Sequence, residues 1–244
     1  MPSIKYNLLI LLSVLITVSS QSAENVIAKI AEASGISYCA NTNTLIVVND
    51  EGTYYEIDTK GKILKKIKLK NYDLEGVVCE EKKILFVRED KGLFWLDRKT
   101  GKKKKIALDT SYKGKKYKLF DKEAGIEGIA KIGNIVYLSK QSKKKKHSFI
   151  AVFRLKPYPA KMIDIIKLDI PDIAGLTYHD KALYMVSDKK DLLIKYDLDK
   201  KKVIEKIKLK KGAWEGIAFD DKGHVYLADD NGRVLKYKIK SLGL

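Results

Sequence analysis

The stretch Trp214–Asp220 reads WEGIAFD, and four related stretches precede it in the chain. They are ASGISYC from Ala33, LEGVVCE from Leu74, IEGIAKI from Ile126 and IAGLTYH from Ile173. Their glycines, at positions 35, 76, 128, 175 and 216, are 41, 52, 47 and 41 residues apart. Recurrence at roughly this period is typical of solenoids and propellers. The repeat is therefore the feature from which the fold should be predicted.

Each repeat contains four short segments that are rich in β-branched and aromatic residues. In the fourth repeat these segments are IAGLTYH from Ile173, ALYMVS from Ala182, LLIKYD from Leu192 and KVIEKIKL from Lys202. Four such segments separated by turn residues describe a four-stranded propeller blade. We predict an all-β fold, a five-bladed β-propeller of four-stranded blades.

The two ends of the chain indicate how the ring closes. The fifth repeat ends at Leu244 without a fourth segment, whereas VIAKI at 26–30 resembles VIEKI at 203–207. We therefore expect the N-terminal strand to complete the last blade, which leaves no open edge in the ring. Thr110–Ala124 is predicted to be a loop between blades two and three. Six blades are the alternative if this segment contains further strands.

The N-terminus has the composition of a secretory signal peptide. Lys5 precedes an uncharged apolar run, Leu8–Val18, which small residues follow. We expect residues 1–23 to be a signal peptide and 24–244 to form a single propeller domain. The protein is then exported, to the periplasm or cell envelope. The alternative is an uncleaved N-terminal segment that anchors it.

The chain is strongly basic, with a formal net charge of +18. Lysine supplies nearly all of the excess, including runs at 102–105 and 143–146, while only four residues are arginine. Phosphate recognition favours the planar fork of arginine, so we expect no nucleic-acid partner. The lysines are interpreted as a solvated surface, with weak contact to an anionic membrane surface as the sharper alternative. We expect a monomer.

Two cysteines enter what we expect to be an oxidising compartment, where a disulfide is to be considered. Cys39 lies four residues after Gly35, and Cys79 lies three residues after Gly76. Side chains alternate along a strand, so these offsets place the two cysteines on opposite faces of their strands. We therefore expect no disulfide between them, and we interpret Cys79 as a buried packing position.

The repeat also predicts a cluster of acids. The inner strand of each blade starts at one face of the ring, and the second strand returns antiparallel and ends beside that start. The starts carry Ser34, Glu75, Glu127, Ala174 and Glu215; the ends carry Asp50, Glu89, Lys140, Asp188 and Asp229. Carboxylates forced together must protonate or bind a cation. Oxygen ligands without histidine or thiol nearby suit calcium.

We accordingly predict a calcium site at the mouth of the central channel. Its ligands are predicted to be Glu75, Glu127 and Glu215, with Asp50, Asp188 and Asp229 behind them. The alternative is structural: the glutamates accept backbone N–H groups from the neighbouring blade.

The ordered set of motifs resembles the SdiA-regulated (YjiK-like) family. EASGISY with VVNDEG, DLEGV with LFVRED, IEGIA, IAGLTY with MVSDK, and WEGIAFDDKGHVYLADD carry this resemblance over essentially the whole chain after residue 23. It implies a five-bladed propeller distantly related to NHL-repeat proteins, envelope-associated, with a calcium site in at least one member. It places the acidic blade starts at Glu75, Glu127 and Glu215.

The chain contains neither a G-x-S-x-G elbow nor an HExxH or CxxC motif. Its histidines are His147, His179 and His224, which we place in loops or turns away from the glutamates. The preferred function is a calcium-binding module for a small ligand or an envelope protein. A calcium-dependent esterase or lactonase is the first alternative, and a lysine-rich surface scaffold is the second.

Overall fold

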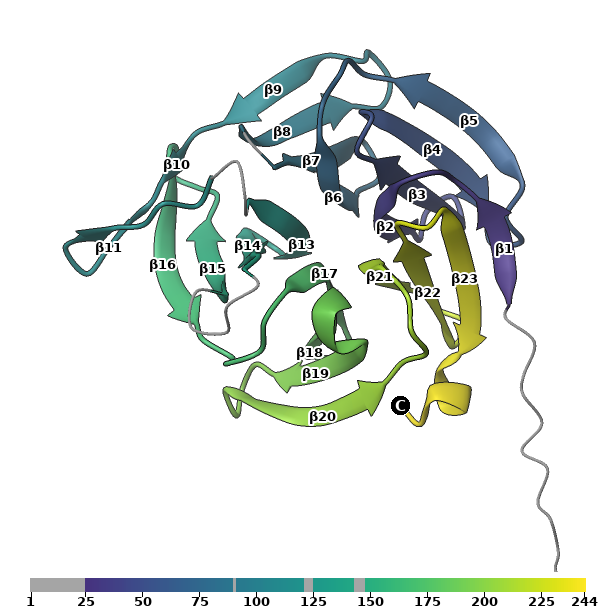
Figure 1. The fold of residues 1–244 in the computed structure, drawn as a ribbon. Coiled ribbons are helices and arrows are strands. Elements are labelled where there is room, and N and C mark those ends of the chain that lie inside the picture. Colours follow the sequence, from purple (N-terminus) through teal and green to yellow (C-terminus); the bar gives the residue numbers. More distant parts are fainter. Residues whose placement is uncertain (1–24, 90, 121–124, 143–147) are drawn as a thin grey trace, which may run out of the picture.

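The computed structural model describes residues 25–89, 91–120, 125–142 and 148–244. These residues form a ring of five β-sheets around a central axis (Figure 1). The predicted signal peptide, the lysine run at 143–146 and His147 lie outside the described residues. Within the described part of the chain, no helix has the length and apolarity needed to cross a membrane.

Each sheet contains one four-stranded blade that runs from the axis outward. Blade 1 holds β2 (Ala33–Cys39), β3 (Thr44–Asn49), β4 (Thr53–Asp58) and β5 (Ile63–Lys68). Blade 2 holds β6 (Leu74–Cys79), β7 (Lys83–Arg88), β8 (Gly92–Asp97) and β9 (Lys103–Ile106). Blade 3 holds β13 (Ile126–Ile132), β14 (Ile135–Lys140), β15 (Phe149–Arg154) and β16 (Ala160–Ile166). Blade 4 holds β17 (Ile173–His179), β18 (Ala182–Ser187), β19 (Leu192–Asp197) and β20 (Lys202–Lys208).

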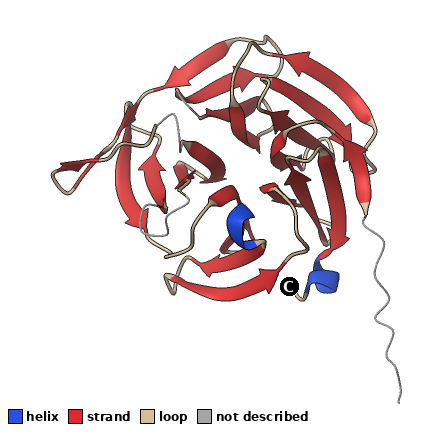
Figure 2. Ribbon diagram, in the orientation of Figure 1, coloured by secondary structure: helices blue, strands red, loops and turns tan. Residues whose placement is uncertain are grey.

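Blade 5 confirms the predicted closure of the ring. It holds β21 (Trp214–Phe219), β22 (His224–Asp229) and β23 (Arg233–Lys238), and its outermost strand is β1 (Val26–Lys29). β1 pairs antiparallel with β23, with Lys29 opposite Arg233. Two 3-10 helices, η2 (Asp188–Lys190) and η3 (Ile239–Leu242), are the helical elements of the described chain, which is otherwise built from strands (Figure 2).

The segment between blades 2 and 3 is more ordered than the predicted loop. β10 (Leu108–Asp109) pairs in parallel with β16, and β11 (Ser111–Tyr112) forms a hairpin with β12 (Lys115–Lys116). Both turn residues of the hairpin, Lys113 and Gly114, have positive φ, at 49° and 73°. This is the backbone of a two-residue type I′ turn, which matches the twist of its strands. A two-stranded hairpin is not a blade, so the ring has five blades.

Apolar side chains fill the five interfaces between neighbouring blades. Each of the five clusters of buried side chains draws on two adjacent blades, as in the contact of Ile36 and Leu45 with Ala218 and Tyr226. Trp214 is 2% exposed between blades 4 and 5, and its indole N–H donates to the Lys210 carbonyl at 2.9 Å. The core is therefore a ring of packed interfaces, not a single central layer.

The expectation that the cysteines remain unpaired is wrong. Cys39 and Cys79 form a disulfide, with their Cα atoms 5.3 Å apart. They do lie at different offsets on β2 and β6, as the spacing indicates. However, these strands belong to adjacent blades. Around the ring, one face of each blade contacts the opposite face of the next blade. Opposite faces on equivalent strands are thus what a disulfide between blades requires.

Candidate functional site

The five repeat glycines crowd the axis of the ring. A Cβ atom on Gly35 would lie 2.3 Å from the Glu75 carbonyl oxygen, and one on Gly128 would lie 2.1 Å from that of Ala174. Gly76, Gly175 and Gly216 likewise pack against the start of the next blade. The cavity that these glycines line has a volume of about 10 Å³, which is room for roughly one water molecule. The channel is nearly closed at this level.

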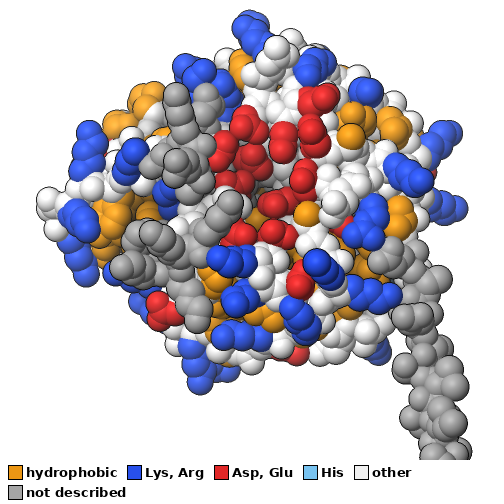
Figure 3. All heavy atoms as spheres, viewed as in Figure 1, with side chains coloured by type: hydrophobic (Ala, Val, Ile, Leu, Met, Phe, Trp, Pro, Cys, Tyr) orange, Lys and Arg blue, Asp and Glu red, His pale blue; other side chains and the backbone are white. Residues whose placement is uncertain are grey.

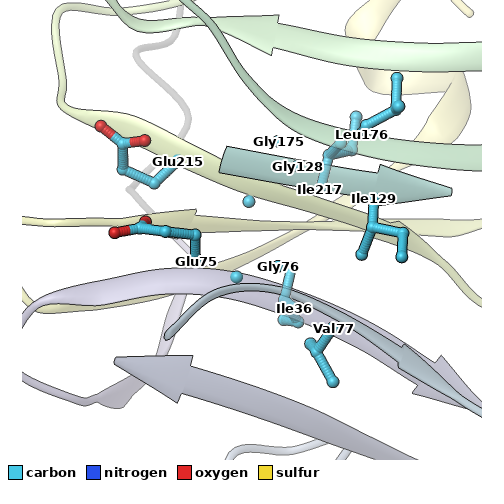
Figure 4. A pocket seen from close by; sticks show the side chains of 12 residues that line it. Ile36, Glu75, Gly76, Val77, Gly128, Ile129, Gly175, Leu176, Glu215 and Ile217 are labelled. Carbon is cyan, nitrogen blue, oxygen red and sulfur yellow. The ribbon is translucent and has the colours of Figure 1, made fainter. Parts of the chain in front are cut away.

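The residue before each glycine lies on the mouth side of this constriction. The strand ladder is irregular at all five blade starts, between Leu74 and Val77 in β6 for example. Such bulges re-aim side chains. In Figure 4 the carboxylates of Glu75 and Glu215 point the same way, whereas Val77 and Ile129 lie on the other side of the glycines. Asn49, Arg88, Lys140, Ser187 and Asp229 pair with the strand starts, so the second strands end at this mouth as predicted.

Acidic side chains gather around the mouth, although the chain as a whole is basic. They form the central cluster of Asp and Glu in Figure 3, with Lys and Arg around the rim. Within it, carboxylate oxygens of Asp50, Asp73 and Glu75 all lie within 4.8 Å of one another. Oxygen atoms this close can contact a single cation.

Burial and mutual repulsion raise the pKa of the blade-start glutamates. Glu75 is 8% exposed, and burial, followed by the charges of Glu127 and Asp50, raises its pKa well above the usual value. Burial also raises the pKa of Glu127 to about 7, although a hydrogen bond with Glu75 acts in the opposite direction. The pKa of Glu215 is raised well above its usual value by burial and then by Glu127 and Asp188. Ionising all three therefore costs free energy unless a cation is present.

Some of the acids at the ends of the second strands also have raised pKa values. Burial and the charge of Asp73 raise the pKa of Asp50 to about 7. The pKa of Glu89 is raised by burial and by a hydrogen bond with Asp73. The pKa of Asp188 is raised by burial and by the charge of Asp172, although Asp188 also accepts the Trp214 N–H at 3.2 Å.

Asp229 is at the predicted end of β22 but is held by other groups. Its side chain is fully buried, and its Oδ2 accepts from Arg233 Nε at 2.7 Å. Its Oδ1 accepts from the backbone and side-chain nitrogens of Asn231, at 2.9 and 2.8 Å. These bonds shape the β22–β23 turn.

The two described histidines lie away from the mouth, as expected. His179 ends β17 and stacks on Phe219, with ring centroids 4.5 Å apart. His224 begins β22, and its Nδ1 lies 2.9 Å from Asp220 Oδ2, which also accepts from the Tyr226 hydroxyl at 2.9 Å. β17 and β21 begin at the acidic mouth, and β22 ends there. His179 and His224 lie at the opposite ends of β17 and β22, and so on the other face of the ring. Neither described histidine therefore lies among the acids of the mouth.

Comparison with known proteins identifies the family. A model of the SdiA-regulated family matches residues 17–236. The chain belongs to the SdiA-regulated family. No curated protein matches its sequence. Among solved structures it is similar to the glutaminyl cyclase of Myxococcus xanthus, with a TM-score of 0.65 and 12% identity, over 88% of this chain and 93% of that one. At this identity the likeness concerns the fold alone.

Two of the acids that the sequence prediction missed in this SdiA-regulated protein share one position in the repeat. Asp73 lies three residues before Gly76, and Asp172 lies three residues before Gly175. Asp172 is 5% exposed, and its Oδ1 has no hydrogen-bond partner among the described residues. Glu32 occupies the same position before Gly35. An acid at this offset in three of five repeats is the pattern that could have revealed them.

Proposed function

We propose that this protein is an exported calcium-binding propeller that acts as a binding module, with the metal at the acidic mouth of its channel. The observation that carries the proposal is the set of buried carboxyl groups with raised pKa on a chain of net charge +18. Burying like charges is unfavourable for folding. A divalent cation removes that cost, because it favours the ionised carboxylates.

The donor set fits calcium. Calcium binds six to eight oxygen atoms at about 2.3–2.6 Å, so two of its ligands lie at most about 5 Å apart. The separations within Asp50, Asp73 and Glu75 fall inside this limit. The uncoordinated Oδ1 of Asp172 adds a buried oxygen on the blade 4 side. Glu127 and Glu215 supply further charge around the cluster.

Two features support the binding role and the location. Asp and Glu side chains are visible on this face in Figure 3, so an ion bound among them can reach an oxygen of a ligand or partner. The Cys39–Cys79 disulfide is typical of proteins from oxidising compartments, which agrees with the signal peptide expected at 1–23.

Calorimetric titration of the chelator-treated protein with calcium tests the metal site. We expect saturable binding and a rise in melting temperature, with a weaker response to magnesium because magnesium requires a tighter octahedral shell. Glu75→Gln and Asp73→Asn should each weaken calcium binding at least about tenfold.

Asp199→Asn is the matched control, since it removes one negative charge from an exposed position in the β19–β20 turn. It should bind calcium as the wild type does. An absence of heat and of any melting shift in the wild type, or unchanged binding in Glu75→Gln, would overturn the proposal.

A further inference from the structure

A second cavity lies between blades 2 and 3, on the face opposite the acidic mouth. Its volume is about 860 Å³, which is in the range of small-molecule sites. Glu80, which follows the end of β6, and Asn134, in the β13–β14 turn, both line it. β6 and β13 begin at the acidic mouth, and Glu80 and Asn134 lie beyond their far ends. The cavity is therefore on the opposite face of the ring. We call this cavity the basic cleft.

The path of the chain fixes the outer wall of the basic cleft. β9 ends at Ile106, and the chain then crosses to the outer edge of blade 3, where β10 lies beside β16 (Figure 1). The Ala160 N–H donates to the Ala107 carbonyl at 2.9 Å at this crossing. Lys104, Lys105 and Ile106 line the cleft from this strand. The cleft is thus bounded by paired strands of two blades.

Positive charge dominates the lining of the basic cleft. Four lining lysines with side chains on this side of blades 2 and 3, and one carboxylate, give 4 − 1 = +3; these residues are Lys83, Lys104, Lys131, Lys156 and Glu80. Lys131 forms an ion pair with Glu80. The ammonium groups of Lys83 and Lys131 also lie 6.0 and 5.9 Å from the Trp95 ring centroid. The indole therefore lies beside two of these ammonium groups, at the outer limit of a cation–π contact.

Apolar surface lies beside these charges. Ile106 and Leu155 are half-buried in the cleft lining, and the Tyr158 ring is 65% exposed. A Tyr ring exposed next to clustered lysines contributes little to folding, whereas rings of this kind commonly contact the ring of a bound ligand. The combination suits a ligand with a charged part and a ring.

We propose that the basic cleft binds a small anion that carries a ring, either a carboxylated sugar or a phosphorylated aromatic base. The anionic group lies between the ammonium groups of Lys104 and Lys156, and the ring packs against Tyr158 and Leu155. This site is separate from the calcium site and does not depend on it.

Binding of two probes to the purified protein tests the proposal and distinguishes the two sources. Trigalacturonate represents the acidic sugars, and adenosine monophosphate represents the phosphorylated bases; maltotriose and adenosine are their uncharged counterparts. Calorimetry measures the affinity, and quenching of tryptophan fluorescence reports on the side of the cleft formed by Trp95.

We expect saturable binding of at least one of the two anions and none of its uncharged counterpart. Lys104→Glu/Lys156→Glu should weaken that binding at least about tenfold, and Tyr158→Ala should weaken it as well. All three side chains are exposed, so the variants should fold. Lys202→Glu/Lys206→Glu in β20 makes the same change in net charge away from the cleft and should bind normally.

Failure of both anions to bind up to about 5 mM would overturn the proposal. Equal loss in the β20 control would overturn it too, because attraction by the overall charge would then explain the binding. Equal affinity for an uncharged counterpart would have the same consequence, since the lysines would play no part.

Discussion

Replacing Glu127 by glutamine should stabilise the metal-free protein at alkaline pH. The pKa of Glu127 is about 7 in the folded protein, against an ordinary value of 4.5. The folded state therefore holds this proton more tightly than the unfolded state does. The stability that Glu127 contributes therefore falls as pH rises from 4.5 towards 7, and it stays reduced above pH 7. A shift of 7 − 4.5 = 2.5 corresponds to about 3 kcal/mol.

Glutamine cannot ionise, so Glu127→Gln does not undergo this loss of stability with rising pH. In excess chelator at pH 8, its free energy of unfolding should exceed that of the wild type by up to about 3 kcal/mol. At pH 4.5 the two proteins should be nearly equal. With calcium at pH 8 the order should reverse, because the ion favours the ionised carboxylate that the variant lacks.

Urea denaturation at several pH values, in chelator and in calcium, measures all these differences. Glu81→Gln, at an exposed position just after β6, is the control and should follow the wild type throughout. The reasoning is refuted if Glu127→Gln is less stable than the wild type in chelator at pH 8, or if both lose stability equally between pH 4.5 and 8.

Two further predictions concern the ring itself. Cys39→Ser/Cys79→Ser should unfold with about 4 kcal/mol less free energy than the oxidised wild type, because the disulfide closes a loop across 40 residues; an equal urea midpoint for both would contradict this. Gly128→Ala should lower the free energy of unfolding by about 1–3 kcal/mol or more, since its Cβ would meet backbone atoms of Ala174 and Leu176 at 2.1 and 2.8 Å. Gly133→Ala, whose Cβ meets nothing within 4 Å but whose φ is 55°, is the comparison in the same denaturation assay and measures backbone strain without a clash, about 1–2 kcal/mol.

The fold could be predicted from the sequence because the repeat is periodic and each copy repeats the same packing. Gly35 and Gly128 are required wherever a blade start meets its neighbour, so the glycines recur even though the residues before them differ. The match between VIAKI and VIEKI predicted the pairing of β1 with β23 for the same reason. Equivalent positions in a closed ring have equivalent partners.

What the repeat did not predict depends on contacts between blades. The Cys39–Cys79 disulfide was missed because face alternation was applied within strands, whereas the bond crosses from one blade to the next. Asp73 was missed because it precedes β6, in a connection whose path the strand pattern does not define. The β11–β12 hairpin occurs once, so no second copy indicated it.

The pairing of β1 with β23 joins the first described strand of the chain to the last. A ribosome makes the N-terminal strand first, and that strand has no partner in its sheet until Arg233–Lys238 has been made. Ring closure thus cannot occur cotranslationally on a partial chain, and its long sequence separation makes it slow. A chain truncated before β23 leaves both β1 and β22 with exposed edges, which favours aggregation. The last blade therefore makes closure of the ring conditional on synthesis of the chain through Lys238.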